Sequence, residues 1–160
     1  MSLLVLGVLL WAGTHLFPAV AVDVRSRLIE RFGSGPYRGG FALLIVISVV
    51  LIILGWKAAT PMLVYRSPSL GPPLTGMAMA VALILFFSAR ARTNIKRAIR
   101  HPQLTGVLIW AVGHLLANGD SRSLVLFGGL GLWCVMQIVA INRREGPWIR
   151  PDPVPRRLDA

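Results

Sequence analysis

Residues 41–56 read FALLIVISVVLIILGW, sixteen residues without one Asp, Glu, Lys or Arg. Such a run is typical of a helix that crosses a lipid bilayer, which needs roughly 17–25 predominantly apolar residues. Four further runs without a charged residue lie at Met1–Val22, Leu74–Phe87, Leu104–Ala117 and Leu124–Ile141. The sequence therefore predicts an all-α fold, a polytopic bundle of about five transmembrane helices.

The composition favours the same class. The chain has 160 residues, of which 55% are apolar and only 14% are charged, whereas soluble domains carry about 25% charged residues. The formal net charge is +11, which in a soluble protein would indicate a nucleic-acid partner. A soluble enzyme and a nucleic-acid-binding domain are both poor descriptions of this chain, and the lipid bilayer is its expected environment.

The basic residues are segregated by loop. Fourteen of the seventeen follow the first, third and fifth apolar runs, and only Lys57, Arg66 and Arg122 follow the second and fourth. Because loops rich in Lys and Arg stay in the cytoplasm, we expect the N-terminus outside and the C-terminus in the cytoplasm. The first run has no basic residue before it, so we interpret it as an uncleaved helix and not as a signal peptide.

The remaining segments connect the spans of one transmembrane domain, residues 1–142, which a Pro- and Arg-rich cytoplasmic tail follows at 143–160. Residues 25–40 are expected to form a cytoplasmic turn with a short interfacial helix before its glycines. The prolines of residues 60–73 predict an outer loop. Residues 88–100 are expected to extend the third span as a basic amphipathic helix.

A short motif occurs twice. Trp11-Ala12-Gly13-Thr14-His15-Leu16 and Trp110-Ala111-Val112-Gly113-His114-Leu115 both read W-A-x-x-H-L. By the predicted topology these two helices run antiparallel. Two similar inward faces about a pseudo-two-fold axis would suit a ligand held between them.

A polar side chain inside an apolar span normally faces the interior of the bundle. With a rise of 1.5 Å per residue, we place His15 and His114 at depths that differ by about 6 Å. Two imidazoles on facing helices are a common protein contribution to a haem b, and Trp11 and Trp110 would flank such a ring. The alternative is that each histidine only hydrogen-bonds a neighbouring helix.

Four other residues have weaker signals. His101, before Pro102, is expected either to cap and anchor the fourth span or to contact the edge of a cofactor. Asn118 lies one turn beyond His114 on its face, and Asp120 is placed to cap the fifth span. The single Cys134 is expected to be a packing residue. No residue is assigned a catalytic role.

The chain resembles the NnrU family, through four segments at Trp11–Pro18, Tyr37-Arg38, Arg100-His101-Pro102 and Trp110–Asp120. The resemblance implies a bacterial inner-membrane protein linked to nitrite and nitric oxide reduction in denitrification. The family is also similar to plant 15-cis-zeta-carotene isomerase, in which two histidines ligate haem b. Matched motif by motif, that pair falls on His15 and His114, which implies haem b with these two axial ligands.

Three functions follow as hypotheses. The first is a haem b protein that supports nitrogen-oxide chemistry or isomerises a lipid-soluble polyene. The second is a non-enzymatic membrane factor that assembles or regulates a nitric oxide reductase. The third is an S-adenosylmethionine-dependent methyltransferase, because Arg100-His101-Pro102 followed by Gly106 is similar to a motif of such membrane enzymes. Residues 142–148 hold only one acid where those enzymes have two, so this reading is the weakest.

Overall fold

A computed structural model of the chain describes residues 1–154. No β-strand forms in this range, apart from one isolated bridge between Leu63 and Asp120. A π-helical turn at Leu124–Gly128 joins α7 to α8, so that Ser121–Glu145 is one continuous helix, called α7–α8 below. The helices are α1 Ser2–Val20, α2 Val22–Phe32, α3 Ser34–Ala58, α4 Gly71–Ser88, α5 Ile95–Ala98, α6 Pro102–Ala117, α7 Ser121–Ser123 and α8 Gly129–Glu145.

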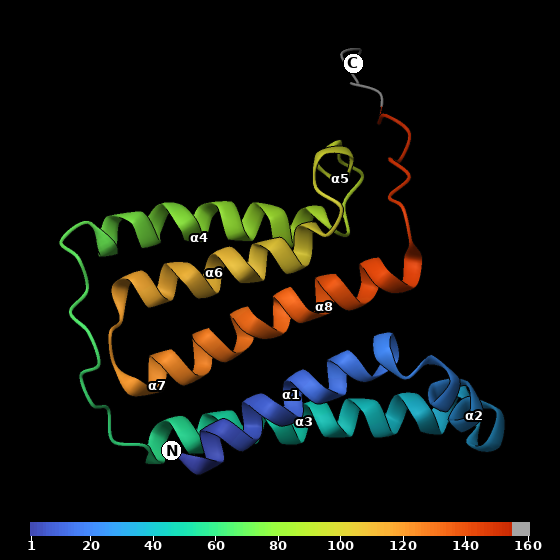
Figure 1. The fold of residues 1–160 in the computed structure, drawn as a ribbon, viewed down its shortest axis with the longest axis horizontal. Coiled ribbons are helices and arrows are strands. Elements are labelled where there is room, and N and C mark those ends of the chain that lie inside the picture. The colour runs from blue at the N-terminus through green and yellow to red at the C-terminus, as the bar shows by residue number, and fades with distance from the viewer. Residues whose placement is uncertain (155–160) are drawn as a thin grey trace.

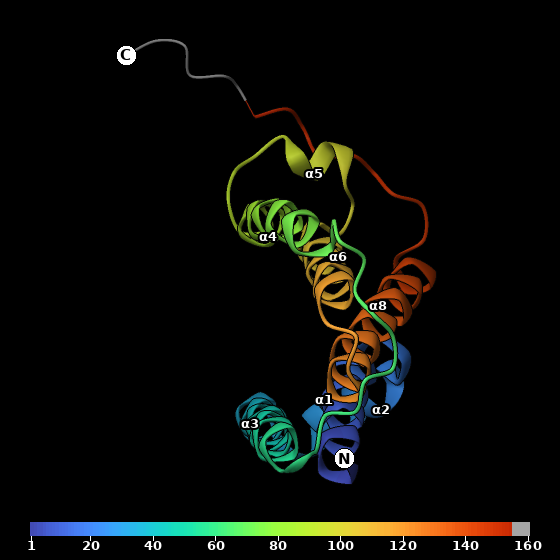
Figure 2. The same ribbon diagram turned by 90° about the vertical axis from the view of Figure 1, so that its left-hand side faces the viewer.

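The long helices lie side by side in one curved row, in the order α3, α1, α7–α8, α6 and α4 (Figures 1 and 2). Neighbours in this row pack on one another, and the α7–α8 helix lies between α1 and α6. The two helices that carry W-A-x-x-H-L run in opposite directions, as expected (Figure 1). They do not face each other directly, however, because each packs on the α7–α8 helix.

Four helices are long and apolar enough to cross a membrane, namely α1, α3, α4 and the α7–α8 helix. The fifth apolar helix, α6, has only 16 residues, which is about 24 Å at 1.5 Å per residue against a hydrocarbon core of about 30 Å. The chain is therefore an all-α protein with four membrane-spanning candidates and a shorter apolar helix packed among them.

Small residues allow a close contact between α1 and α3. A Cβ atom built on Gly55 would lie 2.2 Å from the backbone nitrogen of Leu4, and one built on Gly7 would lie 2.7 Å from the nitrogen of Ile52. Only glycine admits such an approach of two backbones. This is the usual way in which helices associate in lipid, where apolar side chains gain nothing by leaving the solvent.

Two predicted segments are wrong in detail. The second long helix begins at Ser34 and not near Phe41, because the turn is made by Gly33 alone, with a φ of 87°, and Pro36 fits the first helical turn. The third span ends at Ser88 and has no amphipathic extension; only Ile95–Ala98 is helical beyond it. Asn94 instead forms two hydrogen bonds with the backbone of the tail.

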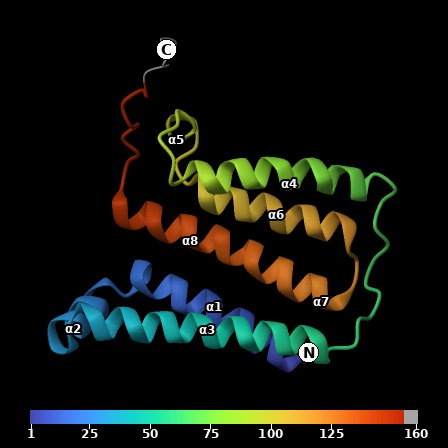
Figure 3. The ribbon, with the colours of Figure 1, turned by 180° about the vertical axis from the view of Figure 1, so that it is seen from behind.

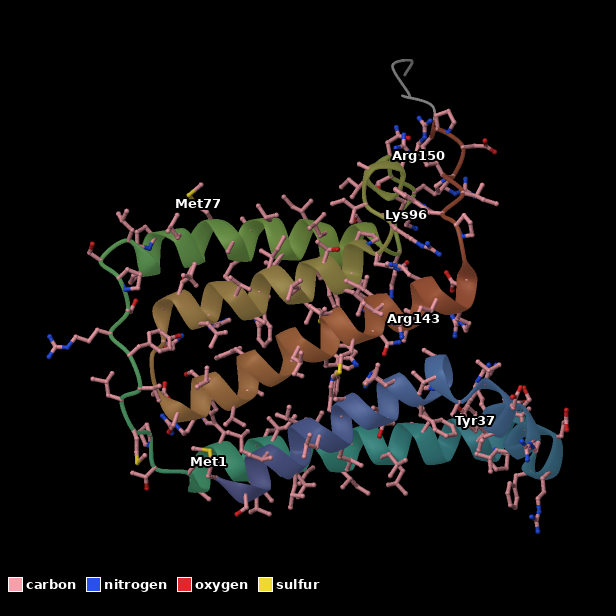
Figure 4. All side chains as sticks on the ribbon, in the orientation of Figure 1. Met1, Tyr37, Met77, Lys96, Arg143 and Arg150 are labelled. Atoms are coloured by element: carbon pink, nitrogen blue, oxygen red, sulfur yellow. The ribbon has the colours of Figure 1, made fainter. Side chains whose placement is uncertain are left out.

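The loops that carry most of the basic residues gather at one end of the row. Helix α2, the α5 loop and the C-terminal segment lie together there (Figure 1), as do the labelled side chains of Tyr37, Lys96, Arg143 and Arg150, while Met1 lies at the other end (Figure 4). Below, the end that holds Met1 is called the strap end, after the loop that crosses it, and the opposite end is called the basic end. Residues 155–160, which include Arg156 and Arg157 of the predicted tail, lie outside the described residues.

The predicted loop at residues 60–73 is a strap that crosses the strap end from α3 to α4 (Figure 3). Only Gly71, Pro72 and Pro73 depart from the prediction, since they form the first turn of α4. The backbone nitrogens of Val64 and Tyr65 both donate to the carbonyl oxygen of Gly119, at 2.8 and 3.1 Å. The strap is thereby fixed to the turn that joins α6 to α7.

Side chains of the strap bind the last carbonyl groups of α6, which have no partner within their own helix. Tyr65 donates its hydroxyl to the carbonyl oxygens of Leu115 and Asn118. Ser67 donates to Leu116. Thr75 of α4 donates to Gly113 at 2.6 Å and so joins α4 to the same end of α6. The hydroxyl groups of Tyr65 and Ser67 therefore complete the C-terminal end of this short helix.

Candidate functional site

A large cavity lies between α1, α4, α6 and α8 and has a volume of about 1200 Å³. Its wall is mostly apolar and rich in aromatic rings, and it combines residues from the middle of the row with Trp148 and Pro151 of the C-terminal segment. Pockets for small molecules are usually apolar hollows of about 300–1,000 Å³ with a few polar groups. The aromatic residues of the wall are Trp11, Phe86, Phe87, Trp110, Trp133 and Trp148.

His15 is one of the polar groups in this wall. Its Nδ1 lies 2.9 Å from the backbone oxygen of Trp11. A carbonyl oxygen only accepts hydrogen bonds, so Nδ1 carries the proton and the neutral ring keeps a lone pair on Nε2. This is the arrangement of a metal-binding histidine whose other nitrogen is fixed by a backbone carbonyl.

Aromatic rings fix the position of the His15 imidazole. Its centroid lies 4.3 Å from that of Trp11, 5.1 Å from Trp133 and 5.7 Å from Phe41. The first two of these rings also line the cavity. The imidazole is therefore held by three helices, α1, α8 and α3, beside an apolar space.

Three residues of the wall have a buried polar atom without a hydrogen-bond partner among the described residues. These atoms are the indole Nε1 of Trp11, the indole Nε1 of Trp133 and the amide Oε1 of Gln137. Trp133 is only 6% exposed, and a buried polar group without a partner costs about 1–3 kcal/mol. The three residues line the cavity, but these atoms are covered by neighbouring groups of the protein.

The sequence prediction missed Trp133 and Gln137. Gln137 is an uncharged polar residue in the middle of the fifth apolar run, and such residues often mark functional positions in membrane helices. That signal was present in the sequence. No such signal marked Trp133, the residue of α8 that contacts the W-A-x-x-H motif, because this contact depends on which helix lies next to α1.

His114 is placed differently from His15, since it is not one of the residues that line the cavity. Its ring stacks on Phe127, with centroids 4.3 Å apart and planes 4° apart, and contacts Trp110 edge-on at 5.1 Å. Phe127 and Trp133 are six residues apart on the α7–α8 helix, about 9 Å along its axis. The two histidines contact this helix at those different levels.

Two histidines can bind one metal ion only if their ring nitrogens lie close together. Each imidazole nitrogen lies about 2 Å from the metal, so that the two nitrogens are about 4 Å apart. In this arrangement His15 fits a cofactor in the cavity, whereas His114 does not face it across a common centre. Among residues 1–154 there is also no cluster of three or more His, Cys, Asp and Glu side chains placed to hold a metal ion.

His101 begins α6 and lines the cavity near the basic end. Its Nε2 lies 2.8 Å from Oδ1 of Asn142 on α8, so it anchors the start of α6 to the neighbouring helix, as one of its two predicted roles requires. Lys96 and Arg100 line the same part of the wall. The guanidinium of Arg100 donates to the carbonyl oxygen of Gly146 at 2.8 Å.

The other predicted residues divide between the cavity and the strap end. Trp110 lines the cavity and contacts Phe127 at 5.0 Å. Asn118 is not part of the wall; its side chain donates to the carbonyl oxygen of His114, at 2.9 Å, and closes the end of α6. Cys134 is fully buried in the contact between α1 and α8, as a packing residue would be.

Asp120 caps the α7–α8 helix, which confirms its predicted role. Its Oδ1 accepts hydrogen bonds from the backbone nitrogens of Arg122 and Ser123, at 3.0 and 3.1 Å, and its Oδ2 accepts one from the Ser123 hydroxyl at 2.6 Å. Partial burial opposes the charge of this carboxylate. The hydrogen bonds from Ser123 and Arg122, with the positive charge of Arg122, outweigh it and hold the pKa of Asp120 below its usual value.

Comparison with known proteins gives one match. The family model described as NnrU protein matches residues 3–159, nearly the whole chain. No protein of curated function and no solved structure matches it. The match includes both W-A-x-x-H-L motifs, His101 and the C-terminal segment beside the cavity, and this chain belongs to the NnrU family.

Proposed function

We propose that the chain is a membrane protein that binds haem b in the cavity between α1, α4, α6 and α8, with His15 as an axial ligand. The observation that carries the proposal is the position of the His15 ring. Its Nδ1–H group donates a hydrogen bond to the Trp11 carbonyl oxygen, and its Nε2 nitrogen keeps a lone pair in a ring that lines a large aromatic cavity. Haem would supply an iron centre that changes its redox state and its ligands.

The cationic side chains of the wall support haem over a pure hydrocarbon. Haem b carries two carboxylates, which can pair with Lys96 or Arg100 at the basic end. A polyene without oxygen forms no ion pair with either side chain. If the protein converts a polyene, the polyene is a substrate, and haem is the ligand that stays bound in the cavity.

His114 is the proposed second ligand, and its position sets a condition on the proposal. The contacts of the two histidines with the α7–α8 helix lie at levels about 9 Å apart. Ligation of one iron by both therefore requires that α6 moves along the α7–α8 helix when haem binds. If it does not move, His15 is the only protein ligand of the two.

The biological role that we propose is in nitrite and nitric oxide reduction, which the resemblance to the NnrU family led us to expect, at the inner membrane of a bacterium. Isomerisation of a lipid-soluble polyene is the second candidate, supported by the apolar wall, which can receive such a molecule from the bilayer. In both roles the cavity holds the ligand against an apolar wall, and His15 keeps its orientation through Trp11.

The test is an absorption spectrum of the protein purified from cells supplied with a haem precursor. We expect a Soret band in the wild type and at least a tenfold loss of bound haem in His15→Ala. In His114→Ala we expect haem to be retained with an altered spectrum if both histidines ligate the iron. His101→Ala is the matched control, because that side chain already has Asn142 as its partner. A wild-type protein without a Soret band, or a His15→Ala variant that holds haem normally, would refute the proposal.

A further inference from the structure

A second cavity, of about 570 Å³, lies between α1, α2 and α3 at the basic end. It shares no lining residue with the cavity beside His15. Its wall is almost wholly apolar and includes Phe17 of α1, Leu28 of α2 and Phe41 of α3. We call this space the α2 groove.

Glycines keep the α2 groove open. Gly13 of α1 and Gly40 of α3 both line it, and a Cβ atom built on either would meet no atom within 4 Å. This distinguishes them from Gly7 and Gly55, which are needed for close contact between the same two helices. The protein itself therefore makes no use of the space beside Gly13 and Gly40.

The groove has two polar residues in its wall, Thr14 and Tyr37, and one charge beside it. The hydroxyl of Tyr37 is buried and has no hydrogen-bond partner among the described residues. The guanidinium carbon of Arg25 lies 5.8 Å from the centre of the Tyr37 ring. Figure 4 shows Tyr37 at the basic end, close to α2. An occupant that ends at this point meets the positive charge of Arg25.

Helix α2 has the properties of a helix that lies in the membrane surface. It carries Arg25, Arg27 and Arg31, and none of its residues is buried by the rest of the protein. Helices of this kind place their apolar side in the headgroup region and attract anionic lipids. Two of its apolar side chains, Leu28 and Phe32, face the groove and form its wall on that side.

We infer that the α2 groove binds one acyl chain of an anionic glycerophospholipid. The chain lies against the apolar wall beside Gly13 and Gly40, and the phosphate lies at the mouth of the groove, where it pairs with Arg25. Charge complementarity selects an anionic headgroup, and the volume and apolar wall of the groove select a lipid tail. This inference does not depend on haem.

The test is native mass spectrometry of the purified full-length protein in detergent, with added phosphatidylglycerol or phosphatidylcholine of the same acyl chains. The wild type is expected to hold one phosphatidylglycerol at least tenfold more tightly than phosphatidylcholine. Gly40→Leu fills the groove and should weaken that binding at least tenfold. Gly39→Leu is the matched control, because Gly39 also has no atom within 4 Å of its Cβ position but does not line the groove.

One further variant separates the tail from the headgroup. Arg25→Gln leaves the apolar wall intact, so it should abolish the preference for phosphatidylglycerol while one lipid of either kind still binds. Equal binding of the two lipids by the wild type would overturn the anionic assignment. Equal binding of phosphatidylglycerol by Gly40→Leu and Gly39→Leu would overturn the site itself. The haem spectrum of Gly40→Leu should be unchanged, which keeps this result distinct from the test of His15.

Discussion

Replacing Asp120 with alanine should destabilise the protein measurably. The substitution removes the acceptor of two backbone N–H groups and of the Ser123 hydroxyl, and it removes the ion pair with Arg122, whose Nε lies 3.6 Å from Oδ1. Loss of an N-cap costs about 0.5–2 kcal/mol. Because Ser123 is only 1% exposed, water cannot replace the lost acceptor, and we expect a value near 2 kcal/mol.

For a chain of this length, 1 kcal/mol corresponds to about 2–4 °C in the midpoint of thermal unfolding. Asp120→Ala should therefore lower the midpoint by about 4–8 °C, measured in detergent by intrinsic tryptophan fluorescence. Asp152→Ala is the control, because Asp152 is an exposed acid of the C-terminal segment. A fall of less than about 1 °C for Asp120→Ala, or equal falls for both variants, would refute the capping argument.

The same carboxylate predicts a dependence on pH. The folded pKa of Asp120 is below the unfolded value, so the stability it contributes is complete above about pH 4 and is lost as the pH falls through the folded pKa. Asp120→Asn keeps an N-cap side chain but does not titrate. Between pH 5 and pH 3 its midpoint should fall less than that of the wild type, and parallel falls in the two proteins would contradict the assignment.

Two other changes test the contacts that hold the row together. Gly55→Ala places a methyl group 2.2 Å from the backbone of Leu4, so it should separate α1 from α3 and lower the midpoint of thermal unfolding by several degrees. Gly39→Ala is the control, because Gly39 has open space around it. This variant should leave the midpoint unchanged or raise it. Tyr65→Phe removes the hydroxyl that binds the carbonyl groups of Leu115 and Asn118 and should cost about 1–3 kcal/mol; thermal unfolding measures it, and no change would show that water replaces the hydroxyl.

The sequence was sufficient for the class of fold because the free energy of membrane insertion depends on composition over about twenty residues. The charge-free runs and the loops rich in arginine are visible without any tertiary information. The Asp120 cap was also predictable, since it depends on residues two and three positions away. The short helix α6 shows the limit of this reasoning: the apolar pattern predicted a span, and its length in the structure is only 16 residues.

The order of the helices in the row could not be predicted in the same way. In lipid, the choice of neighbour depends on fine steric fit and small residues, and an apolar surface carries no signal for it. The repeated W-A-x-x-H-L motif gave the local face of each histidine but not the element that this face contacts. Both faces contact the α7–α8 helix, His15 at Trp133 and His114 at Phe127, so two similar motifs have different surroundings.

The two ends of the cavity-bearing helices are built in different ways. At the strap end, hydroxyl groups of Tyr65, Ser67 and Thr75 bind the last carbonyls of α6, and the strap pairs with the turn that follows. At the basic end, the C-terminal segment is held by isolated hydrogen bonds, such as that from Arg97 to Pro151 at 3.1 Å. Local opening has the lowest cost where few bonds must break. Local opening is therefore expected at the basic end, beside Arg100 and His101, before it occurs at the strap end.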